Sequence, residues 1–149
     1  MILVLYAEEV NWAFLFIGNR DKENMDTEKY KKEVHDTYMK YYVPGFSNSD
    51  IPTIDKIVKY PIAHIQNGTV SMHEKYPVDP QQLKTDKGWD HTSDWKFEVT
   101  AAIEKKAHAV ASSIRRRKDG SIIENVNAFY AFTKTNDGWK MFVVSDVTF

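Results

Sequence analysis

The sequence has no cysteine among its 149 residues. This absence excludes disulfide bonds, thiolate nucleophiles and zinc sites with cysteine ligands. A surplus of charge is also missing, because 20 lysine and arginine residues are matched by 21 aspartate and glutamate residues. A net charge near zero favours neither nucleic acid nor an anionic membrane as a partner. Since no disulfide framework suggests secretion, we expect a cytoplasmic protein.

The sequence also lacks the short motifs of common cofactor and metal sites. It has no glycine-rich phosphate loop, no nucleophile elbow around a serine and no pair of metal-binding histidines at helical spacing. We therefore predict neither a cofactor nor a resident metal.

An apolar stretch occupies residues 1–24, but it is too interrupted for a signal peptide or a membrane span. Glu8 and Glu9 divide it, and the first basic residue, Arg20, follows the apolar stretch instead of preceding it. A spanning helix would bury both carboxylates in hydrocarbon. We expect no association with a membrane.

Two interpretations of this N-terminal stretch stay open. It forms either an extra helix that docks through Leu5, Trp12 and Phe16, or an extension that precedes a natural start at Met25. We favour the extension, because the residues from Met25 onward begin like a helix with its own cap and early acidic residues. The predicted functional domain is residues 25–149.

The overall composition is that of one globular domain. Apolar residues make up 42% and charged residues 28%, and aromatic residues reach 13% with eight tyrosines and eight phenylalanines. A chain of this length builds a single hydrophobic core.

Two helices are predicted at the start of the domain. Between residues 27 and 43, one helical face collects Tyr30, Val34, Tyr38 and Tyr41. We expect Pro44-Gly45 to end this helix. A shorter helix is predicted over residues 51–58, with Pro52 suited to its first turn.

Strand signals follow the helices. Asn67-Gly68 predicts a tight hairpin, because both residues tolerate the positive φ of a type I′ turn. Residues 77–94 are polar and irregular, and predict a loop with about one helical turn. Four long antiparallel strands are then predicted, with the sequences WKFEVTAAI, AHAVASSIRRR, SIIENVNAFYAFTK and WKMFVVSDVTF.

Two Asp-Gly turns set the predicted register of the last three strands. A two-residue loop at Asp119-Gly120 pairs Arg115 with Glu124, which is a favourable pair of opposite charges, and Ala109 with Tyr130.

The same loop type is predicted at Asp137-Gly138. It pairs Lys134 with Met141 and Tyr130 with Ser145. A three-residue loop would place two lysines opposite each other, which is unfavourable.

In this register both faces of the sheet are largely apolar. One face carries Ala107, Ala109, Ala111, Tyr130, Phe132, Trp139, Met141, Val143 and Ser145. The opposite face carries His108, Val110, Ile114, Asn125, Asn127, Phe129, Phe142, Val144 and Asp146. We expect helices to cover one face, and a second copy of the chain or the N-terminal segment to cover the other. The sequence therefore predicts a homodimer through the sheet, and the three alanines leave room for a cavity.

The order of these elements resembles the nuclear transport factor 2-like (NTF2-like) superfamily, which includes the SnoaL-like and ketosteroid isomerase-like proteins. The closest local match is FTKTNDGWKMFVVSD, which looks like the closing hairpin of the family. The resemblance covers residues 26–149. It implies an α+β cone, in which a strongly curved and mainly antiparallel sheet wraps around N-terminal helices and leaves an apolar pocket.

Activities differ widely within this superfamily, so the fold alone does not imply one. The isomerase branch binds an oxyanion with a tyrosine and a protonated carboxylic acid, and uses a second carboxylate as base. By this resemblance the chain offers Tyr38 or Tyr42 on the first helix and Asp146 on the last strand. However, the predicted register turns Asp146 away from the face that carries Tyr130.

Two histidines on the small hairpin are candidates for chemistry. The predicted pairing of His64 with Ser71 and of His73 with Ile62 makes the imidazoles diagonal neighbours. A shared metal would require a third ligand, and Glu74 points the other way. The open interpretations are a general base at His64 and a structural histidine.

The segment GWDHTSDW places four further candidates before the first long strand. His91 and Asp94 would form a pair that orients a base over an apolar ligand, flanked by Trp89 and Trp95. The alternative is a loop held in place by two buried indoles.

Most tyrosines of the first helix are expected in the core, but the hydroxyl of Tyr38 or Tyr42 can face a cavity and bind a ligand. The basic run at residues 115–118 is interpreted as a solvated hairpin tip, because strand alternation splits it between two faces.

The leading hypothesis is a homodimer that binds an apolar or aromatic small molecule. The predicted ligand-binding residues are Tyr38, Tyr42, His64, Trp89, Trp95, Tyr130 and Ser145. The alternative is an acid–base enzyme of the isomerase, dehydratase or hydrolase type, with His64 or the His91–Asp94 pair as base and a tyrosine as donor. A third possibility is a protein-binding adaptor, which would have a filled interior. A polar, titratable cavity favours the enzyme.

Overall fold

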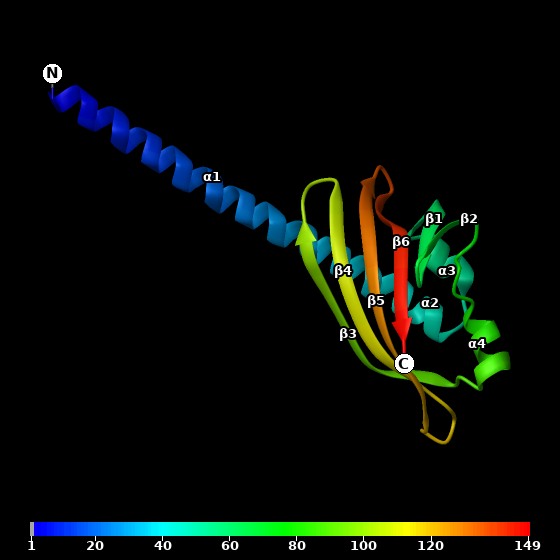
Figure 1. The fold of residues 1–149 in the computed structure, drawn as a ribbon. Coiled ribbons are helices and arrows are strands. Elements are labelled where there is room, and N and C mark those ends of the chain that lie inside the picture. Colours follow the sequence, from blue (N-terminus) through cyan, green and yellow to red (C-terminus); the bar gives the residue numbers. More distant parts are fainter. Residues whose placement is uncertain (1) are drawn as a thin grey trace.

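The computed structural model describes the backbone of residues 2–149 and the side chains of residues 18–149. Helices come first and a sheet follows, as Figure 1 shows. The helices are α1 (Ile2–Thr37), α2 (Val43–Ser47), α3 (Ile51–Asp55) and α4 (Pro80–Lys87), with a π-helical turn, η1 (Tyr38–Tyr42), between α1 and α2. The strands are β1 (Val58–Gln66), β2 (Thr69–His73), β3 (His91–Ala102), β4 (Lys106–Arg116), β5 (Ile122–Thr135) and β6 (Gly138–Thr148).

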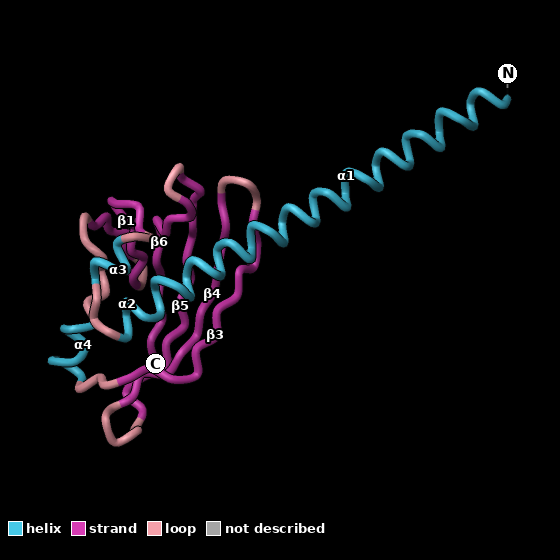
Figure 2. Tube along the Cα trace, turned by 180° about the vertical axis from the view of Figure 1, so that it is seen from behind, coloured by secondary structure: helices cyan, strands magenta, loops and turns pink. Residues whose placement is uncertain are grey.

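The predicted α+β cone is confirmed. The six strands form one open sheet in the order β2-β1-β6-β5-β4-β3, in which only β1 and β6 are parallel. The sheet curves around η1, α2, α3 and the C-terminal part of α1, which all lie on one face (Figures 1 and 2). The core between these layers includes Val34, Tyr38, Ile54, Ile62, Phe132 and Met141, each at most 1% exposed.

The first helix differs from the prediction at both ends. Helical structure is continuous from Ile2 through η1 and α2 to Ser47, so it neither starts near residue 27 nor stops before Pro44. Proline lacks an N–H and its ring collides with the carbonyl four residues earlier in a regular α-helix. In η1 the hydrogen bonds span five residues instead of four, and the N–H of Val43 donates to the carbonyl of Tyr38. This wider turn accommodates the proline within the helix.

The N-terminal part of α1 extends beyond the sheet (Figures 1 and 2). The side chains of Leu5, Trp12 and Phe16 lie outside the described residues, and the domain boundary at residue 25 stays a prediction. None of the described helices is both long enough and apolar enough to cross a membrane.

The short helices begin and end at recognisable caps. Asp50 caps α3, because its side chain accepts hydrogen bonds from the N–H and the hydroxyl of Thr53. The predicted helix at this position is confirmed, although it ends at Asp55. Helix α4 is longer than the single predicted turn, with Asp79 as its N-cap and Gly88 in the left-handed conformation at its C-terminus.

Both predicted registers before β6 are confirmed in their central part. In the small hairpin His64 pairs with Ser71. Between β4 and β5, Arg115 pairs with Glu124 and Ala109 with Tyr130, and a bulge appears only at the turn.

The predicted register between β5 and β6 is wrong. Thr135 pairs with Gly138, so the turn residues are Asn136-Asp137, and the register then shifts by one residue between Met141 and Val143. Phe142 is the extra residue of this bulge. Tyr130 therefore pairs with Val144 and Ala128 with Asp146, instead of the predicted neighbours.

The bulge coincides with a proline in the neighbouring strand. The parallel pairing of β1 with β6 also shifts, between the pairs Val58–Met141 and Ala63–Val143. Pro61 lies in this interval of β1 and has no N–H to donate to β6. As a result, the alternation of β6 changes after Met141, and Asp146 instead of Ser145 faces the helices.

A tyrosine-lined cavity as candidate functional site

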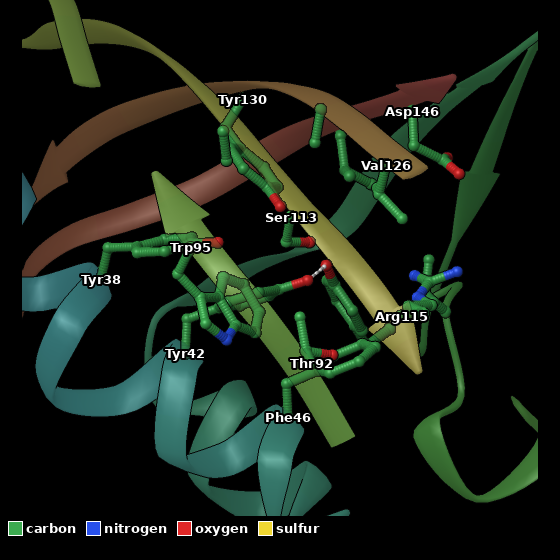
Figure 3. A pocket seen from close by; sticks show the side chains of 15 residues that line it. Tyr38, Tyr42, Phe46, Thr92, Trp95, Ser113, Arg115, Val126, Tyr130 and Asp146 are labelled. Carbon is green, nitrogen blue, oxygen red and sulfur yellow. Dashed lines mark hydrogen bonds between the residues drawn. The ribbon is translucent and has the colours of Figure 1, made fainter. Parts of the chain in front are cut away.

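A narrow cavity lies between the helices and the inner face of the sheet. Fifteen side chains line it, from η1, α2, the segment before α4, and strands β3 to β6 (Figure 3). The space open to the centre of a water molecule is about 30 Å³. A water molecule requires at least about 10–15 Å³ by this measure, so the cavity holds about two.

Four tyrosines, Tyr38, Tyr42, Tyr76 and Tyr130, form most of the inner end, and we call this set the tyrosine cluster. Tyr42 and Tyr76 share a hydrogen bond of 2.9 Å between their hydroxyls. The Tyr38 ring stacks on Tyr42 at 4.6 Å and on Phe97 at 3.8 Å between ring centroids. Stacking fixes the ring planes, so the hydroxyls are held in place.

The hydroxyls of the tyrosine cluster are neutral over the whole physiological range. Burial raises the pKa of Tyr38, Tyr76 and Tyr130 well above the usual value. Burial also raises the pKa of Tyr42, although hydrogen bonds and the charge of Arg115 act in the opposite direction. Each phenol therefore keeps its proton, and one of the protons of Tyr42 and Tyr76 forms the bond between these two hydroxyls.

The hydroxyl of Tyr38 is the least satisfied polar group of the cavity. The residue is 1% exposed, and its hydroxyl makes no hydrogen bond of ordinary geometry with any residue that the structure describes, although the neighbouring Tyr130 hydroxyl offsets part of the increase in its pKa. The side chain extends from η1 towards the cavity (Figure 3). A buried hydroxyl without a partner costs about 1–3 kcal/mol, which a polar ligand atom would recover.

A histidine–carboxylate pair lies at the other end. Nε2 of His64 and Oδ1 of Asp146 are 3.0 Å apart, and the side chains are 10% and 22% exposed. Asp146 lines both the inner cavity and an outer recess with a volume of about 410 Å³, whereas His64 lines only the recess. The pair thus connects the tyrosine cluster with solvent.

A buried cation stands beside this pair. Arg115 is 8% exposed and, like Asp146, lines both the cavity and the recess. Its Nη1 donates to Glu124 at 2.6 Å, and Nζ of Lys87 donates to the other carboxylate oxygen at 2.7 Å. Burial opposes the ionisation of Glu124, but the hydrogen bonds from Lys87 and Arg115 outweigh it, and the pKa of Glu124 is lowered.

Several predicted site residues lie at this cavity. Tyr38, Tyr42, Tyr130 and Trp95 line it, and His64 lies at its mouth. The predicted diagonal contact of His64 with His73 is present, with ring centroids 5.8 Å apart. No group of three or more potential metal-ligating side chains occurs in the described part of the chain.

Other predicted site residues lie elsewhere. The His91–Asp94 pair does not form, because His91 contacts Asp90 at 2.9 Å and Asp94 contacts Arg116 at 3.5 Å, on the surface. The positive φ of Asp94, 56°, belongs to an irregular stretch of β3 that separates the two side chains.

Two further predictions change with the fold. Trp89 is 3% exposed and does not line the cavity; its ring packs edge-on against Phe46 and its Nε1 donates to Thr92. Ser145 lies on the outer face of the sheet, beside Val147, because of the bulge at Phe142.

Sequence reasoning did not assign Tyr76, Arg115 or Asp146 to the cavity. Arg115 was expected in a solvated tip and is instead buried, although the correctly predicted pair with Glu124 was a signal for its burial. Tyr76 follows β2 in an irregular segment whose path no local pattern fixes. Asp146 was excluded by the register error alone.

A curved sheet around N-terminal helices with a polar cavity inside defines a protein of the cone-shaped α+β class. The family model described as "NTF2-like protein (DUF6841)" matches residues 28–148. The chain therefore belongs to this NTF2-like family, and the resemblance noted in the sequence is confirmed. A search of curated proteins finds no match.

Solved structures share the fold at low sequence identity. An NTF2-like protein of unknown function from Pseudomonas putida has a TM-score of 0.60 at 11% identity, covering 78% of this chain and 84% of that one. A candidate aromatic ring hydroxylase from Novosphingobium aromaticivorans has a TM-score of 0.55 at 19% identity, covering 79% and 87%. A candidate dehydratase from Streptomyces avermitilis has a TM-score of 0.56 at 11% identity, covering 80% and 95%. At these identities the similarity shows the fold alone.

Proposed function

We propose that the protein binds a small molecule in the cavity, with a planar apolar body against the aromatic rings and an oxygen at the tyrosine cluster. The observation that carries this proposal is the buried Tyr38 hydroxyl, which has no partner among the described residues. Buried polar groups are nearly always hydrogen-bonded, so an exception that points into a cavity favours a missing ligand.

A ligand with one aromatic ring requires a lining side chain to move, because the open space is about 30 Å³. Trp95 is suited to this movement. It is partly exposed, and it separates the cavity from a groove with a volume of about 370 Å³ that is lined by His35, Met39 and Val43. Displacement of the indole would join the two spaces, and the irregular pairing of β3 just before Trp95 lowers the cost.

Ligand-observed NMR with phenol, 4-hydroxybenzamide and 4-hydroxybenzoate tests the binding proposal. We expect at least one of these compounds to bind the wild type, and the Ala111→Leu substitution, which fills the cavity, to abolish binding. Ala101→Leu on the exposed part of β3 is the matched control. If neither the wild type nor Trp95→Ala binds any of the three, the proposal is wrong.

The His64–Asp146 pair favours a second candidate function, acid–base chemistry on a carbonyl or hydroxyl compound. Asp146 is held by His64 and faces the same cavity as the neutral phenols. A carboxylate base opposite hydrogen-bond donors is the arrangement that proton abstraction next to a carbonyl requires, since the donors stabilise the developing oxyanion.

Hydrogen exchange of acetophenone in deuterated water tests this second function. Acetophenone combines one ring with a carbonyl and exchangeable methyl protons, and NMR follows their loss. We expect the wild type to accelerate exchange, Asp146→Asn to abolish the acceleration, and Asp137→Asn in the β5–β6 turn to leave it unchanged. Equal rates with and without wild-type protein would leave binding as the function.

We also infer that the protein forms a homodimer through the outer face of the sheet. The described helices cover the inner face of the sheet and leave its outer face open (Figures 1 and 2). The outer face has an open groove next to Val110 and Val147, which are 40% and 62% exposed. Lys96 and Glu98 flank the same groove and would allow complementary contacts in a twofold interface.

Native mass spectrometry tests the dimer. We expect a dimeric mass for the wild type and a monomeric mass for Val110→Glu, because the substitution would bury a charge in the interface. Ile103→Glu, at an exposed position in the β3–β4 turn, should stay dimeric. A monomeric wild type would refute the inference.

A further inference from the structure

The cavity combines aromatic walls with a buried cation at its mouth, and this combination narrows the class of ligand. Arg115 is 8% exposed and lines both the inner cavity and the outer recess. Its guanidinium carries five N–H donors in a planar fork. Among the described residues, Arg115 donates a hydrogen bond to Glu124 through Nη1.

Arg115 shares its carboxylate partner with a second cation. Lys87 and Arg115 share the single carboxylate of Glu124, so this triad carries one net positive charge. Three other carboxylates, Asp79, Asp86 and Asp146, line the outer recess, and none of them forms an ion pair with Arg115. The triad therefore retains the charge and the spare donors that an anion requires.

The charge of Arg115 acts on a tyrosine that lines the cavity. The positive charge of Arg115 counteracts part of the increase that burial causes in the pKa of Tyr42. The guanidinium also lies 5.7 Å from the centre of the Phe46 ring, which helps to fix its position. Arg115 is thus a cation held by Glu124 and Phe46, and its charge acts on groups that line the cavity.

A buried hydroxyl lies at the other end of the same cavity. The hydroxyl of Tyr38 is buried and has no partner among the described residues. Figure 3 shows Tyr38 and Arg115 on opposite sides of the lining, with the aromatic rings between them. A ligand that satisfies both groups carries an anion at one end, a ring in the middle and an oxygen at the far end.

We propose that the cavity takes a small aromatic carboxylic acid, whose carboxylate binds Arg115 and whose opposite end presents a hydroxyl or carbonyl oxygen to Tyr38. This inference rests on the proposed binding function and adds the chemical class of the ligand. A guanidinium binds a carboxylate through two parallel N–H bonds, and such charged hydrogen bonds are about twice as strong as neutral ones.

Binding of matched compounds to the full chain tests the class. 4-Hydroxybenzoate and 4-hydroxybenzamide have nearly the same shape and differ in charge. By calorimetry we expect the wild type to bind the acid at least about tenfold more tightly than the amide. Benzoate, which lacks the hydroxyl, should bind more weakly than 4-hydroxybenzoate in the wild type but equally in Tyr38→Phe.

Two variants test whether Arg115 causes the tighter binding of the acid than of the amide. Arg115→Gln combined with Glu124→Gln removes the ion pair without leaving a buried charge, and we expect it to bind acid and amide equally. Arg117→Gln, an exposed arginine at the same hairpin tip, should keep the preference. Thermal unfolding of each variant establishes that it is folded before affinities are compared.

The outcomes separate this inference from the function on which it rests. If the amide binds as tightly as the acid, or if the double variant keeps the preference for the acid, the ligand class is wrong and the binding function stands. If no compound binds either the wild type or Trp95→Ala, both are wrong. A preference for the acid that disappears only in the double variant supports both.

Discussion

The buried carboxylate of Glu124 allows a quantitative test of the mouth of the cavity. Glu124 is 9% exposed and accepts hydrogen bonds from Arg115 and Lys87 at 2.6 and 2.7 Å. Removing one partner of a buried ion pair costs about 3–5 kcal/mol, because the remaining charge stays buried. In Glu124→Gln the amide oxygen still accepts one hydrogen bond from Arg115, so we expect a smaller loss of about 2–3 kcal/mol in the free energy of unfolding.

Lys87 provides the matched control. Its side chain is 42% exposed, so it returns to water when its partner is lost. We expect Lys87→Met to cost no more than about 1 kcal/mol, as for other exposed ion pairs. Urea unfolding of the three proteins, with equal slopes, measures both differences.

The lowered pKa of Glu124 determines how its contribution to the free energy of unfolding changes with pH. The pKa of Glu124 is lowered in the folded state, so the unfolded state binds more protons between the two pKa values. The stabilisation by Glu124 is therefore complete above the pKa of the unfolded state and disappears as the pH falls through the folded value. We expect the difference between the wild type and Glu124→Gln to shrink in acid. A loss no larger than that of Lys87→Met, or a difference independent of pH, would refute the reasoning.

Two further predictions concern the packing of the helices. A side chain at Gly45 would place its Cβ 2.9 Å from Cγ1 of Ile54. We therefore expect Gly45→Ala to lower the free energy of unfolding by about 1–2 kcal/mol, because the cost of overpacking exceeds the gain in helix propensity. Gly18→Ala, which meets nothing within 4 Å, should be neutral or stabilising in the same urea assay. The indole N–H of Trp139 donates to Glu33 at 2.8 Å, and we expect Trp139→Phe to cost about 1–3 kcal/mol. An unchanged urea midpoint would show that this bond does not anchor α1 to the sheet.

Local patterns predicted the site residues on helices and on the small hairpin. Tyr38 and Tyr42 follow from helical spacing, and His64 follows from the register of a two-residue turn. These inferences depend only on neighbours in the sequence, where the geometry of helix and hairpin is nearly fixed.

The position of Asp146 shows where this approach stops. One extra residue in a strand exchanges its two faces, and neither the turn sequence nor the charge pairing indicated the bulge at Phe142. The bulge lies where the β1–β6 register also shifts, beside Pro61, a residue 81 positions earlier that becomes a neighbour only when β1 pairs with β6. A prediction from local sequence patterns does not include this contact, because it forms only between distant segments.

The sequence by itself determined the α+β class, the order of the elements, the aromatic composition of the interior and the pairing of Arg115 with Glu124. Each of these depends on periodicity, turn chemistry or opposite charges, which act between residues that are close along the chain or across one hairpin. Only the tertiary structure decided that the helix continues through Pro44, that Arg115 is buried and that Asp146 meets His64 at the mouth of the cavity. These features arise where distant segments pack, and there the local preferences of the chain are too weak to choose between alternatives.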